Sequence, residues 1–351
     1  MKKILYVTNI PVPYRVKFFN ALARKVDVTV LFERRRGENR DKNWCGGEPI
    51  RFRAEYLRGI PLGAENSLSP GIIRAVFGPY DGVIFGCCNS PVQLLAMLLM
   101  RLRKRPYILN LDGDVFLEGT GRKARLKRFL LSGAAAYLTA GNRAAEAIRG
   151  IAGGRPVVCY PFGSLTEKEV ACSRKKAYGI REKTIAVVGR YFPYKGLDVA
   201  LEAARLAPDL EFCFVGMGDR AEAFRREQKV PENVKIIPFL QKEALAELYA
   251  RCAMVVLPSR QECWGLVVGE AAAFGAPIVS TWGSGAAAEY LGRAYPRYLA
   301  RPGDAQSLLA CIRRLSREDT GQYRDFLLET ARDYTIENCV QAHMRLLEER
   351  L

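Results

Sequence analysis

Short apolar runs alternate with longer segments of mixed polarity along almost the whole chain. The runs are rich in Val, Ile and Leu, which is typical of strands buried on both faces of a parallel sheet. The longer segments carry apolar residues at helical spacing and are expected to form helices. In the first half, the pattern predicts strands at residues 3–8, 28–32, 82–85, 107–111, 136–139 and 157–160. It predicts helices there at residues 14–25, 91–103, 124–132 and 142–149.

The same alternation continues from residue 184 to about residue 330. A linker beginning near residue 161 and a charged stretch at 167–181 separate the two halves. A chain of 351 residues is expected to form two domains, here α/β domains with parallel sheets at residues 1–165 and 166–335. The strands of the second half are expected within 185–190, 212–219, 253–257 and 277–281, and helices at 199–206 and 336–350.

Two glutamates follow the strand predicted at 253–257. Glu262 stands in a loop, and Glu270 lies in the helix that is expected to begin near Gly265. Open α/β sheets bind ligands beyond the carboxyl ends of their strands, next to helix N-termini. The first N–H groups of this helix, at Gly265, Leu266 and Val267, would point at an anion between the carboxylates. This suits a sugar joined through a diphosphate to a ribose. The alternative is an acid near a helix start and a solvated helix residue.

A second loop between a strand and a helix carries two cations. The strand predicted at 185–190 ends in Gly189 and Arg190, and Lys195 follows before the next helix. Cations on such a loop can reach a diphosphate, although two ordinary surface cations would give the same pattern. Gly216 repeats the order of strand, glycine and helix, which alone indicates little.

Together these segments resemble glycosyltransferase family 4, whose members are retaining enzymes of the GT-B fold. The resemblance is strong over roughly residues 180–300. It is weaker in the first half, where the loop from Asn9 to Arg15 is similar to that of members acting on surface polysaccharides. The matching residues are Gly189, Arg190, Lys195, Gly196, Gly216, Gly218, Asp219, Pro258, Ser259, Glu262, Gly265, Glu270, Gly275, Pro277, Gly283, Gly285 and Glu289.

The resemblance implies two Rossmann-like, doubly wound domains that face a central cleft, with the C-terminal helix (residues 336–351) crossing back to the first domain. It implies transfer from a UDP- or GDP-linked sugar to a saccharide or lipid-linked saccharide in cell-surface polysaccharide synthesis, without a cofactor or metal. The catalytic residues would be Glu262, Lys195 and Arg190. The donor-binding residues would be Gly189, Gly216, Gly265, Leu266, Val267 and Glu270.

Two other functions fit the same fold. A sugar-nucleotide epimerase would act on the donor without an acceptor, but its usual acid and base groups are not visible in the sequence. A non-catalytic relative that binds a membrane or polysaccharide would have no need of Glu262, Lys195 and Glu270, all of which are present.

Many members of the family carry a histidine after a strand in the first domain. The single histidine of this chain is His343, in the C-terminal helix, where a structural or solvent-facing role is expected. Asp112 and Asp114 stand at the corresponding place. They would bind acceptor or donor hydroxyls, or simply form an Asx turn. With Arg15, they are the candidates for the acceptor side.

The formal net charge is +17, with basic runs at 101–105 and 122–128. The second run has Leu126, Phe129, Leu130 and Leu131 at helical spacing, so it could lie on an anionic membrane or form a solvated helix face. Nucleic-acid binding is disfavoured because no recognised motif accompanies the charge.

The ten cysteines are scattered and are interpreted as reduced thiols. No apolar run reaches the roughly 18 residues of a membrane span. The apolar N-terminal run is broken by Asn9, Pro11 and Pro13, and is therefore better explained as a first strand than as a signal peptide. The expected location is the cytoplasm, with peripheral binding to the inner face of the plasma membrane.

Overall fold

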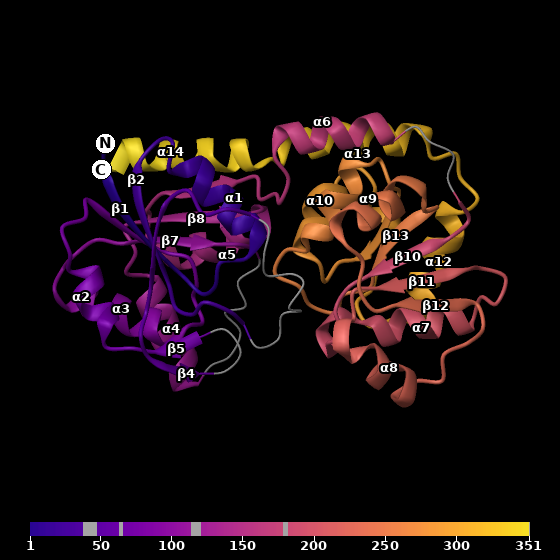
Figure 1. Ribbon diagram of the computed structural model, residues 1–351, viewed down its shortest axis with the longest axis horizontal. Helices are drawn as coiled ribbons and strands as arrows, with labels where there is room; N and C mark the ends of the chain where they lie inside the picture. Colours follow the sequence, from indigo (N-terminus) through magenta and orange to yellow (C-terminus); the bar gives the residue numbers. More distant parts are fainter. Residues whose placement is uncertain (38–47, 63–65, 114–120, 178–181, 351) are drawn as a thin grey trace. The chain divides into compact units, whose positions relative to one another are not determined.

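The computed structural model describes residues 1–37, 48–62, 66–113, 121–177 and 182–350. The chain forms two compact units (Figure 1). Unit 1 comprises Met1–Phe162 and Ile336–Leu351, and unit 2 comprises Gly163–Thr335.

In its described residues, unit 1 contains a seven-stranded parallel sheet and a separate hairpin. The strands of the sheet are β1 (Lys3–Thr8), β2 (Asp27–Phe32), β3 (Arg53–Tyr56), β6 (Gly82–Phe85), β7 (Ile108–Leu111), β8 (Ala136–Ala140) and β9 (Val157–Tyr160). The hairpin pairs β4 (Ile60–Leu62) with β5 (Asn66–Leu68). The helices are α1 (Pro13–Leu22), α2 (Gly71–Val76), α3 (Pro91–Leu102), α4 (Arg122–Leu131), α5 (Asn142–Ala152) and α14 (Ile336–Arg350).

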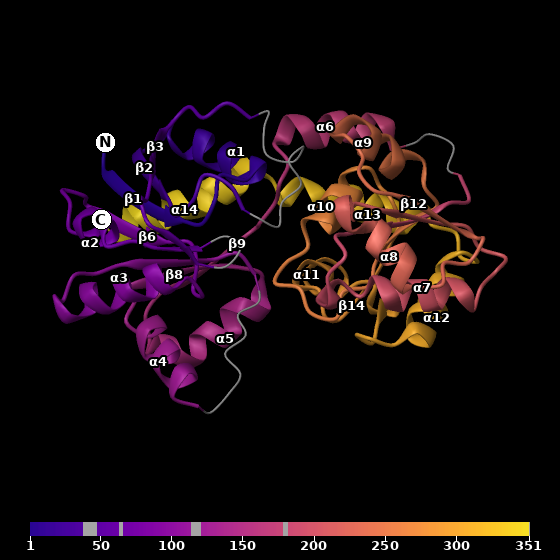
Figure 2. The same ribbon diagram turned by 60° about the horizontal axis from the view of Figure 1, so that its bottom comes forward.

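The sheet of unit 1 is doubly wound, with strand order β3-β2-β1-β6-β7-β8-β9. Side chains alternate along β1: Tyr6 packs on Phe19 of α1, whereas Leu5 and Val7 join the core beneath α2, α3 and α5. Figure 2 shows α1 and α14 on one side of the sheet and α3, α4 and α5 on the other. The winding direction changes between β1 and β6, so their carboxyl ends flank the topological switch point of this unit.

Unit 2 has a six-stranded parallel sheet within the part of it that the structure describes. Its strands are β10 (Ile185–Val188), β11 (Phe212–Val215), β12 (Val234–Ile237), β13 (Met254–Leu257), β14 (Ile278–Thr281) and β15 (Leu299–Ala300). Its helices are α6 (Glu167–Lys176), α7 (Leu197–Arg205), α8 (Ala221–Glu227), α9 (Lys242–Arg251), α10 (Leu266–Ala273), α11 (Gly285–Leu291), α12 (Ala305–Leu315) and α13 (Gly321–Asp333). Short 3-10 turns are η2 (Pro193–Lys195), η3 (Gly218–Arg220) and η4 (Pro296–Tyr298).

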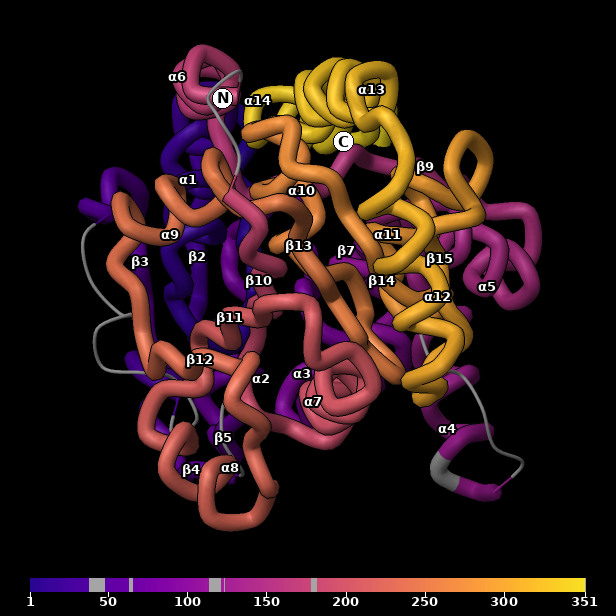
Figure 3. Tube along the Cα trace, turned by 90° about the vertical axis from the view of Figure 1, so that its right-hand side faces the viewer, coloured from indigo at the N-terminus to yellow at the C-terminus, as the bar shows by residue number. Residues whose placement is uncertain are grey.

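The sheet of unit 2 is doubly wound as well, with strand order β12-β11-β10-β13-β14-β15. α7 packs against α12, and α10 packs against α13 and α6 (Figure 3). The switch point lies between β10 and β13. The loops that leave these two strands are those in which the sequence places Arg190, Lys195 and Glu262.

Some expectations from the sequence need correction. The helix expected at 14–25 ends at Leu22. The charged stretch at 167–181 is more than a separator, because α6 begins there with a capping box between Thr166 and Glu169 and packs on α9, α10 and α13. β3, β4, β5 and α2 of unit 1 were not predicted, and neither were β12 and β15 of unit 2. β3 includes the charged residues Arg53 and Glu55, and β4 has only three residues, so neither gives an apolar run of ordinary strand length.

Candidate functional site

The loops after β10 and β13 meet at the switch point of unit 2. Tyr194 O accepts hydrogen bonds from the backbone N–H groups of Arg260 (2.8 Å) and Gln261 (3.3 Å). The Arg260 guanidinium adds a bidentate ion pair with Asp198, with Nη–Oδ distances of 2.7 and 2.6 Å. Gly196 is needed at this junction, because its φ is +66° and a Cβ there would overlap the Pro258 carbonyl. The two loops are therefore joined into one surface beyond the strand ends, here called the ledge.

Lys195 and Glu262 form an ion pair on this ledge. Their side chains are 18% and 12% exposed, so the pair is largely shielded but still open to a ligand. The second Glu262 oxygen accepts a hydrogen bond from the Ser259 hydroxyl (2.7 Å). The Glu262 backbone N–H donates to Gly283 O (2.8 Å), which fixes the residue at both ends. The sequence indicated both side chains but not their direct contact.

Helix α10 begins immediately after Gly265, whose φ of +103° places it in the left-handed region that favours glycine. Glu262 therefore lies in the loop before the helix and Glu270 lies within it, as predicted. The first N–H groups of a helix have no partner within the helix and favour anions. Leu266 and Val267 occupy this first turn and are only partly buried.

Glu270 is held from both sides of its carboxylate. The Tyr249 hydroxyl donates to Oε2 (3.2 Å) and the Ser164 hydroxyl to Oε1 (3.1 Å). Burial, and beside it the negative charge of Glu270, raise the pKa of Tyr249 well above its usual value, so this hydroxyl remains a donor. Glu270 is thus an oriented hydrogen-bond acceptor rather than a freely solvated helix residue.

The remaining candidates of unit 2 surround the same strand ends. Arg190 follows β10 and places its guanidinium 4.9 Å from the centre of the Phe192 ring. Arg220, after β11, lies 4.6 Å from the same ring. Gly189 and Gly216 face each other across β10 and β11, and a Cβ on Gly216 would meet Gly189 O at 3.5 Å. Two cations thus gather beside a glycine-lined part of the sheet edge.

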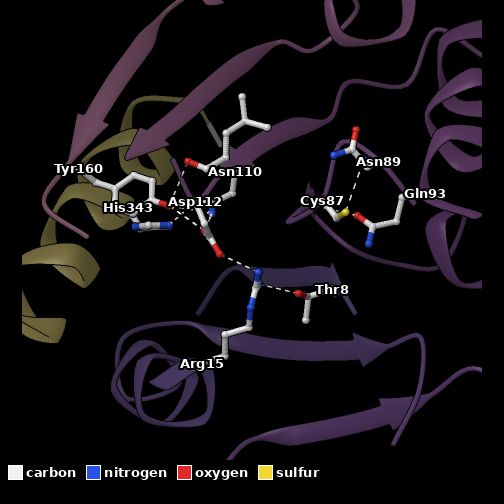
Figure 4. A network of polar contacts seen from close by, with 10 residues as sticks. Thr8, Arg15, Cys87, Asn89, Gln93, Asn110, Asp112, Tyr160 and His343 are labelled. Carbon is white, nitrogen blue, oxygen red and sulfur yellow. Dashed lines mark hydrogen bonds and ion pairs between the residues drawn. The ribbon is translucent and has the colours of Figure 1, made fainter. Parts of the chain in front are cut away.

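Unit 1 brings Arg15 and Asp112 together beyond the carboxyl ends of β1 and β7. Arg15 Nη2 lies 2.6 Å from Asp112 Oδ2, and Nη1 donates to the Thr8 hydroxyl (2.5 Å). Figure 4 shows this pair at the end of a longer network. Asn110 Nδ2 (2.7 Å) and the Tyr160 hydroxyl (2.8 Å) both donate to Asp112 Oδ1. The other acceptor-side candidate, Asp114, lies outside the described residues.

His343 enters this network from α14. Its Nε2 lies 2.7 Å from Asn110 Oδ1, and its Nδ1 lies 2.7 Å from Cys339 O (Figure 4). The side chain is buried, so of the two expectations from the sequence the structural role holds and exposure to solvent does not.

Sequence reasoning missed the residues that orient the candidates. Ser259, Tyr249, Asn110 and Tyr160 each hold a carboxylate; Ser259 and Asn110 stood inside segments singled out in the sequence, but none of the four was assigned this role. Asn110 gave a usable signal, because a polar residue interrupts the apolar run of β7 one step from its end. Over the described residues, no cluster of His, Cys, Asp and Glu side chains suits a metal ion.

The comparisons with known proteins point to one family. Residues 173–334 match the family Glycosyl transferases group 1. The D-inositol 3-phosphate glycosyltransferase of Mycobacterium sp. (strain KMS) is 34% identical over 108 residues, which is 28% of this chain and 25% of that protein. The glycogen synthase of Thermus caldophilus is 39% identical over 126 residues, or 34% of this chain and 28% of that protein. The matched part thus spans only about a quarter of these relatives.

Solved structures match the whole chain at low sequence identity. Sucrose-phosphate synthase from Thermosynechococcus elongatus has a TM-score of 0.73 at 16% identity, covering 99% of each chain. Anabaena HepE, solved in complex with UDP, has a TM-score of 0.72 at 17% identity, covering 99% of this chain and 100% of its own. These similarities confirm the predicted GT-B fold. Residues 173–334 thus match the glycosyl transferases group 1 family, and the chain as a whole has the GT-B fold.

Proposed function

We propose that this protein is a retaining glycosyltransferase that moves a sugar from a UDP- or GDP-linked donor to a saccharide or lipid-linked saccharide, in cell-surface polysaccharide synthesis. The observation that carries the proposal is the Lys195–Glu262 pair on the ledge before α10. The carboxylate there suits the sugar of such a donor, and the cation and the helix start suit its diphosphate. The names of the relatives and the UDP bound in the HepE structure support this class of donor.

Each side chain has a distinct task in this reaction. The anomeric C–O bond to the diphosphate breaks, a bond to the acceptor oxygen forms on the same face, and the acceptor proton passes to the departing phosphate. Lys195 has three N–H donors, so its contact with Glu262 leaves others for phosphate oxygens. Arg190 and the first backbone amides of α10 would neutralise the negative charge that grows on the departing diphosphate. Glu262 would bind sugar hydroxyls and stabilise positive charge at the anomeric carbon. Glu270 would accept hydrogen bonds from the ribose hydroxyls.

A thermal-shift screen of UDP, GDP and their sugars tests the donor. A ligand that binds only the folded state at 100 times its Kd stabilises it by about 2.7 kcal/mol, which raises Tm measurably. We expect one nucleotide series to stabilise the protein, and transfer to continue in the presence of a chelator. Loss of transfer on chelation, restored by a divalent ion, would contradict metal independence. Turnover of the donor to an isomer without acceptor would favour an epimerase.

Unit 1 also presents a basic and apolar surface, which we propose contacts an anionic membrane. In α4, Leu126 and Phe129 are 52% and 48% exposed, whereas Leu130 and Leu131 are buried in the unit and cannot contribute. α4 packs on α3, which also contacts β5. On the hairpin, Ile60 and Leu68 are exposed cross-strand partners. Among the helices of the described residues, none combines the length and the hydropathy of a membrane span.

Replacing the basic residues of α4 should release the protein from anionic vesicles at low salt. Each basic residue near such a surface contributes about 1 kcal/mol. The variant replaces with glutamine Arg122, Lys123, Arg125, Lys127 and Arg128. A control variant replaces exposed cations of unit 2, namely Lys183, Arg225, Arg226, Lys229 and Lys235. Vesicle sedimentation should show loss of binding only in the first variant. Wild-type protein that stays in the supernatant would favour a soluble acceptor.

A further inference from the structure

His343 is the far end of the hydrogen-bond network that holds Asp112. The network runs from the Cys339 carbonyl through the imidazole and the Asn110 amide to the Asp112 carboxylate, which also meets Arg15 and Tyr160 (Figure 4). Asn110, Tyr160 and His343 are buried, whereas the Asp112 side chain is 21% exposed. The network therefore connects the interior of unit 1 to one carboxylate that a ligand can reach.

The donors and acceptors of this network can be counted. Cys339 O only accepts, so His343 Nδ1 must carry a proton. Asn110 Nδ2 donates one hydrogen to Asp112 and one to the Tyr160 oxygen (3.1 Å). Asn110 Oδ1 then faces His343 Nε2, and it can only accept. The arrangement is complete only when both ring nitrogens of His343 carry protons.

A neutral imidazole changes the contact at the other end of the amide. With its proton on Nδ1, the ring offers only a lone pair at Nε2. The Asn110 amide then turns, so that its nitrogen donates to Nε2 and its oxygen faces Asp112 Oδ1, which lies 2.7 Å away in the present arrangement. Two acceptor oxygens at that distance repel, so Asp112 keeps only Arg15 and Tyr160 as donors.

We propose that His343 is a positioning residue: the proton on its Nε2 decides which end of the Asn110 amide faces Asp112, and hence whether that carboxylate is locked in place. The link to turnover rests on the proposed function, in which Asp112 binds a hydroxyl of the donor or acceptor sugar. A carboxylate locked by three partners is preorganised to accept such a hydrogen bond, and a carboxylate held by two is less so.

The surroundings of His343 set the direction of its pH dependence. The titratable or charged groups in this network and around it are Asp112 after β7, Arg15 in α1, Tyr160 in β9, Tyr6 in β1 and Cys339 in α14. Burial raises the pKa of Tyr6, Tyr160 and Cys339 well above their usual values, so these groups stay neutral. Burial lowers the pKa of His343 to about 4, while its bond to Cys339 and the charge of Asp112 act in the opposite direction. The hydrogen bond from Asn110 Nδ2 to Asp112 is therefore favoured as the pH falls.

The first test needs no substrate. Because the chain has one histidine, histidine-specific ¹⁵N labelling gives a single pair of ring-nitrogen NMR signals. We expect Nδ1 to stay protonated, Nε2 to gain its proton as the pH falls from neutral, and the Asn110 side-chain amide signals to move with the same midpoint. Asp112→Asn should lower the midpoint, because the charge that favours the imidazolium is gone. An Nδ1 without a proton, or Asn110 signals that ignore the titration, would overturn the proposal.

The second test uses transfer kinetics. In His343→Gln, the glutamine amide can donate to Asn110 Oδ1 at every pH. The hydrogen bond from Asn110 to Asp112 then no longer depends on an imidazolium. The wild type should lose kcat/KM relative to His343→Gln as the pH rises, by about tenfold, the effect of losing one hydrogen bond to a charged group. Phe18→Leu is the packing control, since Phe18 lies 4.7 Å from the imidazole but donates no hydrogen bond; it should keep the wild-type pH profile.

Equal pH profiles for wild type and His343→Gln would show that the histidine serves packing alone. His343→Phe, which keeps the ring but has no donor, should lie below His343→Gln throughout; if it fails to fold, the other variants still decide. If no transfer is found, the proposed function fails while the NMR titration still tests the network.

Discussion

Glu262→Gln is expected to lower transfer by a factor of about 100 or more while the protein stays folded. The substitution keeps the shape of the side chain and an oxygen for the Ser259 hydroxyl, but removes the charge that faces Lys195 and would face the anomeric carbon. The measurement is release of the nucleoside diphosphate during transfer, with Tm as the check on folding.

The effect should be confined to the reaction. Lys195 stays in place in this variant, so affinity for the nucleoside diphosphate is expected to remain at least as high as in the wild type. The matched control is Glu222→Gln, which removes an exposed carboxylate of unit 2 that pairs with Arg225. Near-wild-type turnover in folded Glu262→Gln would remove that residue from the mechanism.

Lys195→Ala and Arg190→Ala should each weaken binding of the nucleoside diphosphate by roughly tenfold to a hundredfold, the effect of one charge-assisted hydrogen bond. Both side chains leave the loop after β10, where a diphosphate at the start of α10 would meet them. Calorimetry with diphosphate and monophosphate measures the effect, which should be larger for the diphosphate. Lys235→Ala, an exposed cation of the same unit, is the control. Unchanged diphosphate affinity in both variants would place the phosphates elsewhere.

Most of the buried strands were predictable because their signal is local. Buried parallel strands such as β1 and β10 are continuous apolar runs, and the glycine turns after them mark where each strand ends. The hairpin β4–β5 was not predictable, because it is held by long-range contacts such as Glu33 accepting from the Ser67 backbone N–H (3.1 Å). Spacing along the sequence does not reveal such contacts.

The sequence predicted which loops carry the site residues, but not which of their side chains are in contact. The order of strands placed Lys195 and Glu262 on loops at one sheet edge, yet their ion pair depends on the close approach of Gly196 to Pro258. In unit 1, Asp112 could be named, but His343 is more than 200 residues away in sequence and reaches it only through Asn110. The sequence placed His343 in the last helix with a structural or solvent-facing role, but gave no sign of its contact with Asn110.

The discontinuity of unit 1 has a consequence for how the protein is made. Unit 2 is one continuous stretch, Gly163–Thr335, whereas unit 1 needs α14, which is translated after all of unit 2. Domains generally fold during synthesis as their residues become available. Until α14 has left the ribosome, the surfaces of α1 and β9 that it covers, and Asn110 beneath His343, lack their partner. Unit 1, whose sheet is translated first, can therefore be completed only after the whole of unit 2 has been translated.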